Sequence, residues 1–96
     1  MIVTVTEGHP NEAQGVQTEA FLAAFLPRMK REPGVVEILH YTDPESRAAV
    51  TVVVWESEGD VRRYREGELI REAIAFEQKV GESARRAGPF PVQRYV

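Results

Sequence analysis

Few side chains in this sequence have the type and spacing that catalysis requires. Trp55 is the only tryptophan, and one of the two histidines, His40, is followed directly by Tyr41. Because neighbouring residues of a strand point to opposite faces, His40 and Tyr41 cannot act as one catalytic pair, although either could face a cleft alone. Tyr64 lies in the basic run RRYR and could gate the mouth of a cleft. The candidate catalytic residues are His40 as a weak base, Trp55 as an aromatic floor, and Tyr64.

Each of these residues also has a purely structural interpretation. A tryptophan at a strand end can be a core anchor, and a histidine can lie at an edge or an interface without any catalytic role. The RRYR run is equally typical of a solvated helix face, although Arg62 within it could hold an anionic group of a substrate. Phenylalanines between helices and sheet are mainly core, and one or two could border a pocket. The candidate substrate-binding residues are Phe21, Phe25, Tyr41, Arg62 and Phe76.

Composition argues against several other chemistries. The chain has no cysteine, which removes disulfides, thiolate metal sites and cysteine nucleophiles. His9 and His40 lack any H-x-H or H-E-x-x-H spacing, so no metal site is expected. The glycines are isolated, and neither a phosphate-binding loop nor a Ser-His-Asp arrangement can be assembled from the spacing. We therefore expect no cofactor.

Charge and hydropathy bear on partners and location. The net charge of −3 argues against a nucleic-acid-binding protein, and no apolar run approaches membrane-spanning length. The N-terminal segment MIVTVTEGHP lacks the pattern of a signal peptide, and the absence of cysteine suits a reducing compartment. These features predict a cytoplasmic protein with no nucleic-acid or membrane partner.

Hydrophobic periodicity and turn-forming residues divide the chain into strands and helices. Pro27 lies inside the first helical pattern, where it should kink or split that helix. Ser57 and Asp60 form an S-x-x-D capping signal for a short helix, which Gly67 interrupts. The expected elements are a strand at 2–7, a helix at 16–32, strands at 35–43 and 47–56, helices at 58–66 and 68–86, and a final strand at 91–96.

This order, β-α-β-β-α-β, is a split βαβ arrangement. The turn DPES at 43–46 is so short that the strands it joins must form an antiparallel hairpin. The order predicts an α+β, ferredoxin-like sandwich, in which one four-stranded antiparallel sheet carries the helices on one face. No linker divides the chain, so residues 1–96 are expected to form a single domain.

The stretch RAAVTVVVWESE at residues 47–58 has apolar side chains on both faces of its strand. An apolar surface the size of a whole sheet face exceeds what a soluble monomer comfortably exposes. The simplest cover for the face without helices is a second copy, packed sheet against sheet about a twofold axis. The alternative is that the run reflects high β-propensity on a half-exposed sheet. We expect the homodimer.

Two segments, REPGVVEILHYTD and VVVWESEGDVRRYREGELIREA, together with the order of elements, carry a resemblance to a known family. From Ile2 to Val96 the chain resembles the antibiotic biosynthesis monooxygenases. The resemblance implies a dimeric α+β barrel with back-to-back sheets, and a substrate cleft between the helices and the helix-covered face of each sheet. Members of the family include oxygenases that oxidise aromatic polyketides without metal or flavin, and haem-degrading enzymes.

The sequence departs from the haem-degrading members. Those members use an asparagine on the first strand, a tryptophan at the end of the third, and a histidine on the helix that follows. Trp55 matches the tryptophan, but the first strand offers Thr4 and Thr6 in place of asparagine, and residues 57–86 contain no histidine. The segment YREGELIREA, where family members often carry a histidine, has arginines instead. Haem degradation is therefore not expected.

Two classes of function remain. The first is a cofactor-independent monooxygenase acting on a small aromatic or quinol-like molecule, which reacts with dioxygen itself once it is deprotonated. The protein then supplies desolvation, orientation and a weak base. The second is a non-catalytic dimer that binds a small apolar or aromatic molecule or acts as a structural module. An enclosed cavity reached by Trp55 and by an ionisable group would favour the enzyme.

Overall fold

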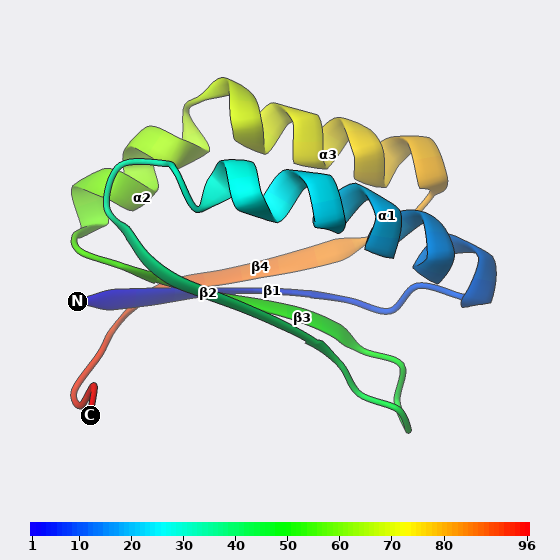
Figure 1. Ribbon diagram of the computed structural model, residues 1–96, viewed down its shortest axis with the longest axis horizontal. Helices are drawn as coiled ribbons and strands as arrows, with labels where there is room; N and C mark the ends of the chain where they lie inside the picture. The colour runs from blue at the N-terminus through cyan, green and yellow to red at the C-terminus, as the bar shows by residue number, and fades with distance from the viewer.

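The computed structural model describes all 96 residues and confirms the predicted α+β, ferredoxin-like fold. Four antiparallel strands form one sheet in the order β2-β3-β1-β4, and the helices lie on one of its faces (Figure 1). In chain order the elements are β1 (Ile2–Gly8), α1 (Glu12–Met29), β2 (Val35–Thr42), β3 (Ala49–Trp55), α2 (Glu58–Arg65), α3 (Glu68–Val80) and β4 (Ala84–Pro91).

Helix α1 begins earlier than the hydrophobic pattern suggests, and Pro27 does not split it. Asn11 and Gln14 form a capping box, in which each side chain accepts a hydrogen bond from the other's backbone N–H. This cap satisfies N–H groups of the first turn, so the helix starts at Glu12. Pro27 lies in the last turn, where a missing N–H costs only one helical hydrogen bond, and α1 continues to Met29.

The boundaries predicted for the last two elements are wrong. Helix α3 ends at Val80 and not at residue 86, because Gly81 adopts a left-handed conformation (φ 74°) that closes the helix. Residues 84–91 then form β4, which pairs with β1. The last strand therefore begins seven residues earlier than the expected strand at 91–96. The Gly81 stop is visible in the sequence, but the polar residues after it continue the helical pattern.

A glycine joins α1 to the sheet. Gly34 has a φ of 84°, and a Cβ at this position would collide with the carboxyl group of Asp60. The Gly34 carbonyl accepts a hydrogen bond of 2.8 Å from the backbone N–H of Glu56, where β3 ends. Ser57 then caps α2, with its side-chain oxygen accepting from the Asp60 N–H. These contacts fix the start of α2 against the beginning of β2.

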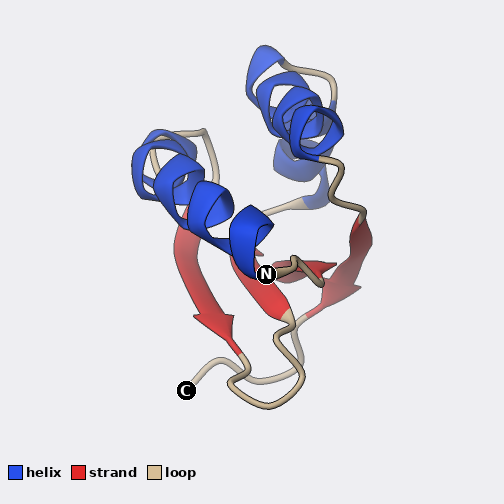
Figure 2. Cartoon of the chain, turned by 90° about the vertical axis from the view of Figure 1, so that its right-hand side faces the viewer, coloured by secondary structure: helices blue, strands red, loops and turns tan.

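The hydrophobic core lies between the helices and one face of the sheet (Figure 2). Trp55 is its most buried side chain, with only 1% of its surface exposed, and Val61 of α2 packs in the same cluster. The cluster consists of Phe25, Met29, Val53, Trp55, Val61, Leu69 and Ala73. No helix combines the length and the apolar content that crossing a membrane requires.

The other face of the sheet, called the open face below, has no helix over it (Figure 2). Cross-strand partners point to the same face, so the register assigns its residues. Leu39, Tyr41 and Phe90 are each about half exposed there. The apolar residues of the open face are Val3, Val5, Leu39, Tyr41, Val50, Val52, Val54, Ala87 and Phe90, and the charged ones are Glu7, Glu37 and Arg85.

Candidate functional site

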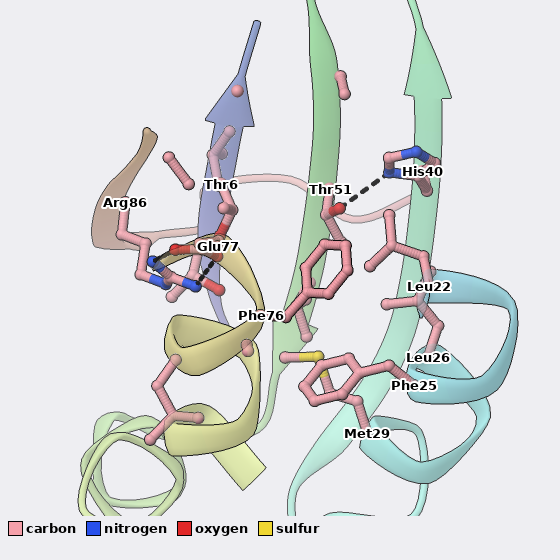
Figure 3. Close-up of a pocket in the computed structure, with 18 of the residues that line it drawn as sticks. Thr6, Leu22, Phe25, Leu26, Met29, His40, Thr51, Phe76, Glu77 and Arg86 are labelled. Carbon is pink, nitrogen blue, oxygen red and sulfur yellow. Dashed lines mark hydrogen bonds and ion pairs between the residues drawn. The ribbon is translucent and has the colours of Figure 1, made fainter. Parts of the chain in front are cut away.

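A cavity of about 100 Å³ lies between the covered face of the sheet and the two long helices (Figure 3). Its walls are mostly apolar, with Leu22, Phe25 and Met29 of α1 on one side and Phe76 of α3 on the other. Strands β1 and β3 form the floor. A site with an apolar lining and few polar groups is typical of pockets for small organic ligands.

Three contacts between α1 and α3 hold the roof of the cavity together. The rings of Phe21 and Phe76 stack with centroids 4.2 Å apart. Arg28 forms a bidentate ion pair with Glu72, with N–O distances of 2.8 and 2.6 Å. The Gln14 side chain donates to the carbonyl oxygen of Val80 at the far end of α3. The phenylalanine stack is the one apolar contact of the three, and both of its rings line the cavity.

Trp55 is both a core anchor and a wall of the cavity, so the two sequence interpretations are not exclusive. Its indole N–H donates to the hydroxyl of Thr4 at 2.9 Å, which satisfies the only polar atom of the side chain. Its ring lies 5.4 Å from the ring of Tyr64. Trp55 therefore has no free hydrogen-bond donor for a ligand, and with 1% of its surface exposed it supports the cavity wall from behind.

Tyr64 lines the cavity with a phenol that stays protonated. Burial raises its pKa to about 12, although the positive charge of Arg86 partly opposes this shift. The hydroxyl makes no hydrogen bond to another residue of the chain. It is therefore a neutral group that can donate to a ligand oxygen.

A row of polar side chains crosses the covered face from one sheet edge to the other. The register pairs His40 with Thr51, Thr51 with Thr6, and Thr6 with Arg86, so the four residues share one face and one line across the strands. All four line the cavity (Figure 3). The row borders the apolar positions around Trp55 and gives the cavity a polar side.

The histidine end of this row is fully hydrogen-bonded. His40 Nδ1 lies 2.9 Å from Thr51 Oγ1, and Nε2 lies 3.3 Å from a carboxylate oxygen of Glu19 on α1. The His40 side chain is 14% exposed, whereas that of Glu19 is 62% exposed. The imidazole therefore connects a hydroxyl in the cavity to a carboxylate at the surface.

The arginine end of the row is a half-buried ion pair. Arg86 donates two hydrogen bonds to Glu77 of α3, at 3.0 and 2.6 Å. These hydrogen bonds raise the pKa of Arg86 above its usual value. Because Glu77 neutralises the guanidinium of Arg86, this end of the row presents a strong dipole and no net charge.

The predicted site residues divide into two groups. His40, Trp55, Tyr64, Phe21, Phe25 and Phe76 all line the cavity. Tyr41 lies on the open face and Arg62 on the exposed side of α2, so neither borders the cavity. The alternation of side chains along a strand already predicts that Tyr41 and His40 lie on opposite faces. The side of α2 that faces the sheet, which decides the position of Arg62, depends on how the helix packs.

Sequence reasoning missed Thr51, Glu19, Glu77 and Arg86. The expected helix at 68–86 includes Arg86, which places this residue on the wrong element. Gly81 is the signal in the sequence that indicates an earlier helix end. Thr51 lies in an apolar run, where the alternation marks it as a covered-face position but not as a partner of His40. No three metal-ligating side chains come together in the structure.

Solved structures share this fold over nearly the full chain. A protein assigned to the antibiotic biosynthesis monooxygenases, from Deinococcus radiodurans, matches with a TM-score of 0.82 at 10% identity, covering 100% of this chain and 99% of that one. SnoaB from Streptomyces nogalater, a cofactor-independent oxygenase, matches with a TM-score of 0.71 at 18% identity, covering 99% and 95%. A protein from Nitrosomonas europaea with the same assignment as the first gives 0.70 at 13% identity, covering 92% and 97%.

Comparisons by sequence find no match, either among protein-family profiles or among curated proteins. At such identities the structural matches establish the fold. The chain has the fold of the antibiotic biosynthesis monooxygenases, as the resemblance in its sequence predicts.

Proposed function

We propose that this protein is a cofactor-independent monooxygenase of the antibiotic biosynthesis monooxygenase type, acting on a small phenolic or quinol-like aromatic molecule. The observation that carries the proposal is the cavity, which combines aromatic walls with the polar row and the Tyr64 hydroxyl. A fold neighbour, SnoaB, is itself a cofactor-independent oxygenase. The fold is compatible with other activities, so the argument rests on the site.

The reaction needs little from the protein, because the substrate supplies all the electrons. In the simplest case one molecule of phenol reacts with one molecule of dioxygen to give one molecule of benzoquinone and one of water. One oxygen atom becomes bonded to a ring carbon, and the other forms water with the two hydrogens that the phenol loses. The phenolate reacts far more readily with dioxygen than the phenol, so the protein must accept one proton and hold the ring in a dry site.

The size of the cavity limits the substrate. An apolar cavity of about 150 Å³ can take up benzene, and pockets for larger ligands measure about 300–1,000 Å³. The cavity here has a volume of about 100 Å³. A single ring therefore needs lining side chains such as Phe21 and Phe76 to move aside, and a molecule with several fused rings needs a larger movement of α1 and α3.

The proposal includes a homodimer in the cytoplasm, formed through the open face. Valines line the centre of that face, and Leu39, Tyr41 and Phe90 expose about half of their surfaces on it. The C-terminal residues pass beneath one end of the sheet (Figure 1), where the Tyr95 hydroxyl donates to Glu37. An apolar surface of this kind is the pattern of a protein interface.

Oxygen uptake tests the function. Purified protein treated with a metal chelator is given phenol, catechol, hydroquinone and 1-naphthol, and both dioxygen consumption and quinone absorbance are recorded. We expect one dioxygen consumed per quinone formed, with no hydrogen peroxide released, from at least one single-ring phenol, and a loss of about 100-fold in rate for His40→Ala. Binding of these phenols without oxygen uptake would favour the second candidate, a non-catalytic binding protein. The Arg86–Glu77 pair agrees with that candidate, because a guanidinium neutralised by a carboxylate can contact a ligand without taking part in a reaction.

A further inference from the structure

Three side chains link the interior of the cavity to the surface. Thr51 lines the cavity, its hydroxyl lies 2.9 Å from His40 Nδ1, and His40 Nε2 lies 3.3 Å from Glu19 (Figure 3 shows the first contact). They come from β3, β2 and α1, so the link exists only in the folded sheet and helix together. Exposure increases along it, from 14% for the His40 side chain to 62% for that of Glu19.

The partners of His40 determine how the hydrogens are arranged. A carboxylate can only accept, so Nε2 carries the ring proton and donates to Glu19. Nδ1 is then an acceptor, and Thr51 donates its hydroxyl hydrogen to it. The free lone pairs of the Thr51 oxygen remain available to accept a hydrogen bond in the cavity. The link therefore presents an acceptor to a ligand, which is the polarity that deprotonation of a phenol requires.

We propose that Thr51, His40 and Glu19 form a proton relay that removes the hydroxyl proton of a phenolic ligand from the cavity. The inference rests on the proposed function and adds two residues to it. Thr51 touches the ligand, His40 holds the proton, and Glu19 is a positioning residue that fixes the orientation of the imidazole.

The proton transfers balance without any other reactant. The ligand hydroxyl gives its proton to the Thr51 oxygen, and the original Thr51 hydrogen moves to Nδ1 of His40. The products are a phenolate in the cavity and an imidazolium ion beside the Glu19 carboxylate. A phenolate alone in an apolar cavity would be strongly disfavoured, and the neighbouring imidazolium offsets that cost. The Glu19 carboxylate, 3.3 Å from Nε2, stabilises this imidazolium and holds its orientation during the transfer.

The relay is tested with 4-nitrophenol, whose phenolate is yellow and whose phenol is not. At a pH where most of the free probe is protonated, wild-type protein should raise the ionised fraction of the bound probe. Thr51→Val, which keeps the side-chain shape and removes the hydroxyl, should lower the ratio of bound phenolate to phenol about tenfold, one pKa unit of the probe. Thr51→Ser restores a hydroxyl and should keep the ratio. Thr42→Val, on the same face of β2 but outside the cavity, is the matched control.

Glu19 needs a readout that a structural role would not change. Nitrogen NMR of the His40 ring should find the proton on Nε2 in the wild type. In Glu19→Gln the amide can donate instead of accept, and the proton should shift to Nδ1 in a measurable fraction of molecules. The variant should bind 4-nitrophenol as the wild type does and ionise less of it.

The outcomes separate the relay from the proposed function. An unchanged ionised fraction in Thr51→Val, or a bound probe that wild-type protein does not ionise, would overturn the relay. If the probe is ionised by way of Thr51 but no phenol drives oxygen uptake, the relay stands and the monooxygenase proposal fails. If oxygen uptake is equally fast in Thr51→Val and in the wild type, the function stands and the relay is wrong.

Discussion

The two faces of the sheet belong to the same strands and differ in polarity. On β3 the covered face carries Thr51 between Ala49 and Val53, and the open face carries only valines. A monomer usually has the reverse arrangement, with polar side chains on the face without helices. The covered face buries a polar row in a cavity, whereas the open face leaves apolar side chains partly exposed.

This inversion indicates what each face meets. A polar row beneath two helices costs free energy unless its groups are hydrogen-bonded, and His40, Thr51 and Arg86 are. An exposed apolar face is disfavoured unless another apolar surface covers it. These properties agree with the proposed phenolic ligand at the covered face and with the proposed dimer at the open face.

A charge at the centre of the open face should give the largest effect. Val52→Lys would bury an uncompensated ammonium group in the proposed dimer, and we expect association to weaken about 1,000-fold. Sedimentation across a range of protein concentrations measures this change. Val16→Lys, on the exposed surface of α1, is the control and should not alter it. A wild-type protein that sediments as a monomer at micromolar concentration would contradict the proposed dimer through the open face.

Trp55→Phe tests the covered face at its most buried position. The change removes the indole N–H that donates to Thr4 and leaves a void beside Tyr64. We expect the free energy of unfolding to fall by about 2–3 kcal/mol. Urea unfolding measures it, and Tyr41→Phe on the open face should change the stability by less than about 0.5 kcal/mol. Equal losses for the two variants would mean that the faces do not differ in packing.

Phe76→Ala opens the roof of the cavity. The ring of Phe76 is only partly buried, so the expected loss of stability is about 2 kcal/mol, less than for a fully buried phenylalanine. The wider cavity should bind 1-naphthol at least as tightly as phenol, whereas the wild type should prefer phenol. Calorimetric titration of both ligands gives the ratio. Ile74→Ala, on the exposed side of the same helix, should leave it unchanged.

Two tyrosines, one beside each face of the sheet, have pKa values that are raised for different reasons. Burial raises the pKa of Tyr64 to about 12, whereas a hydrogen bond to the Glu37 carboxylate raises the pKa of Tyr95. Absorbance titration of Glu37→Gln should therefore find Tyr95 ionising at lower pH and Tyr64 unchanged. A shift of the Tyr64 titration in that variant would show that the two faces are coupled.

The sign of the stability effect follows from the raised pKa of Tyr64. The unfolded chain releases this proton near pH 10.0 and the folded chain near pH 12, so the folded state is favoured while the phenol is protonated. The contribution is fully present below pH 10 and is lost as the pH rises towards 12. Tyr64→Phe should reduce this loss in urea unfolding measured across the same range.

Much of the fold follows from local patterns in the sequence. Runs rich in β-branched residues predict β1 and β3, the Ser57 cap predicts the start of α2, and the Pro33–Gly34 pair predicts the end of α1 near its observed limit. The end of α3 could not be predicted from periodicity alone. Four of residues 82–86 are polar, and the segment suits a helix as well as a strand, so pairing with β1 decides between them.

The candidate site could be predicted only in part. Aromatic residues at helical spacing indicate the walls of the cavity, and the face of the strand assigns His40 once the covered side is known. The partners of His40 lie on other elements, 11 residues away for Thr51 and 21 for Glu19. No local pattern relates residues at such separations.

The sequence by itself determined the alternation of side chains along each strand, because that alternation depends only on the geometry of the local backbone. It therefore also determined that one strand would present two apolar faces. Only the tertiary structure decided that His40, Thr51, Thr6 and Arg86 lie in one row, because the register between strands depends on turns, bulges and helix packing across the whole chain.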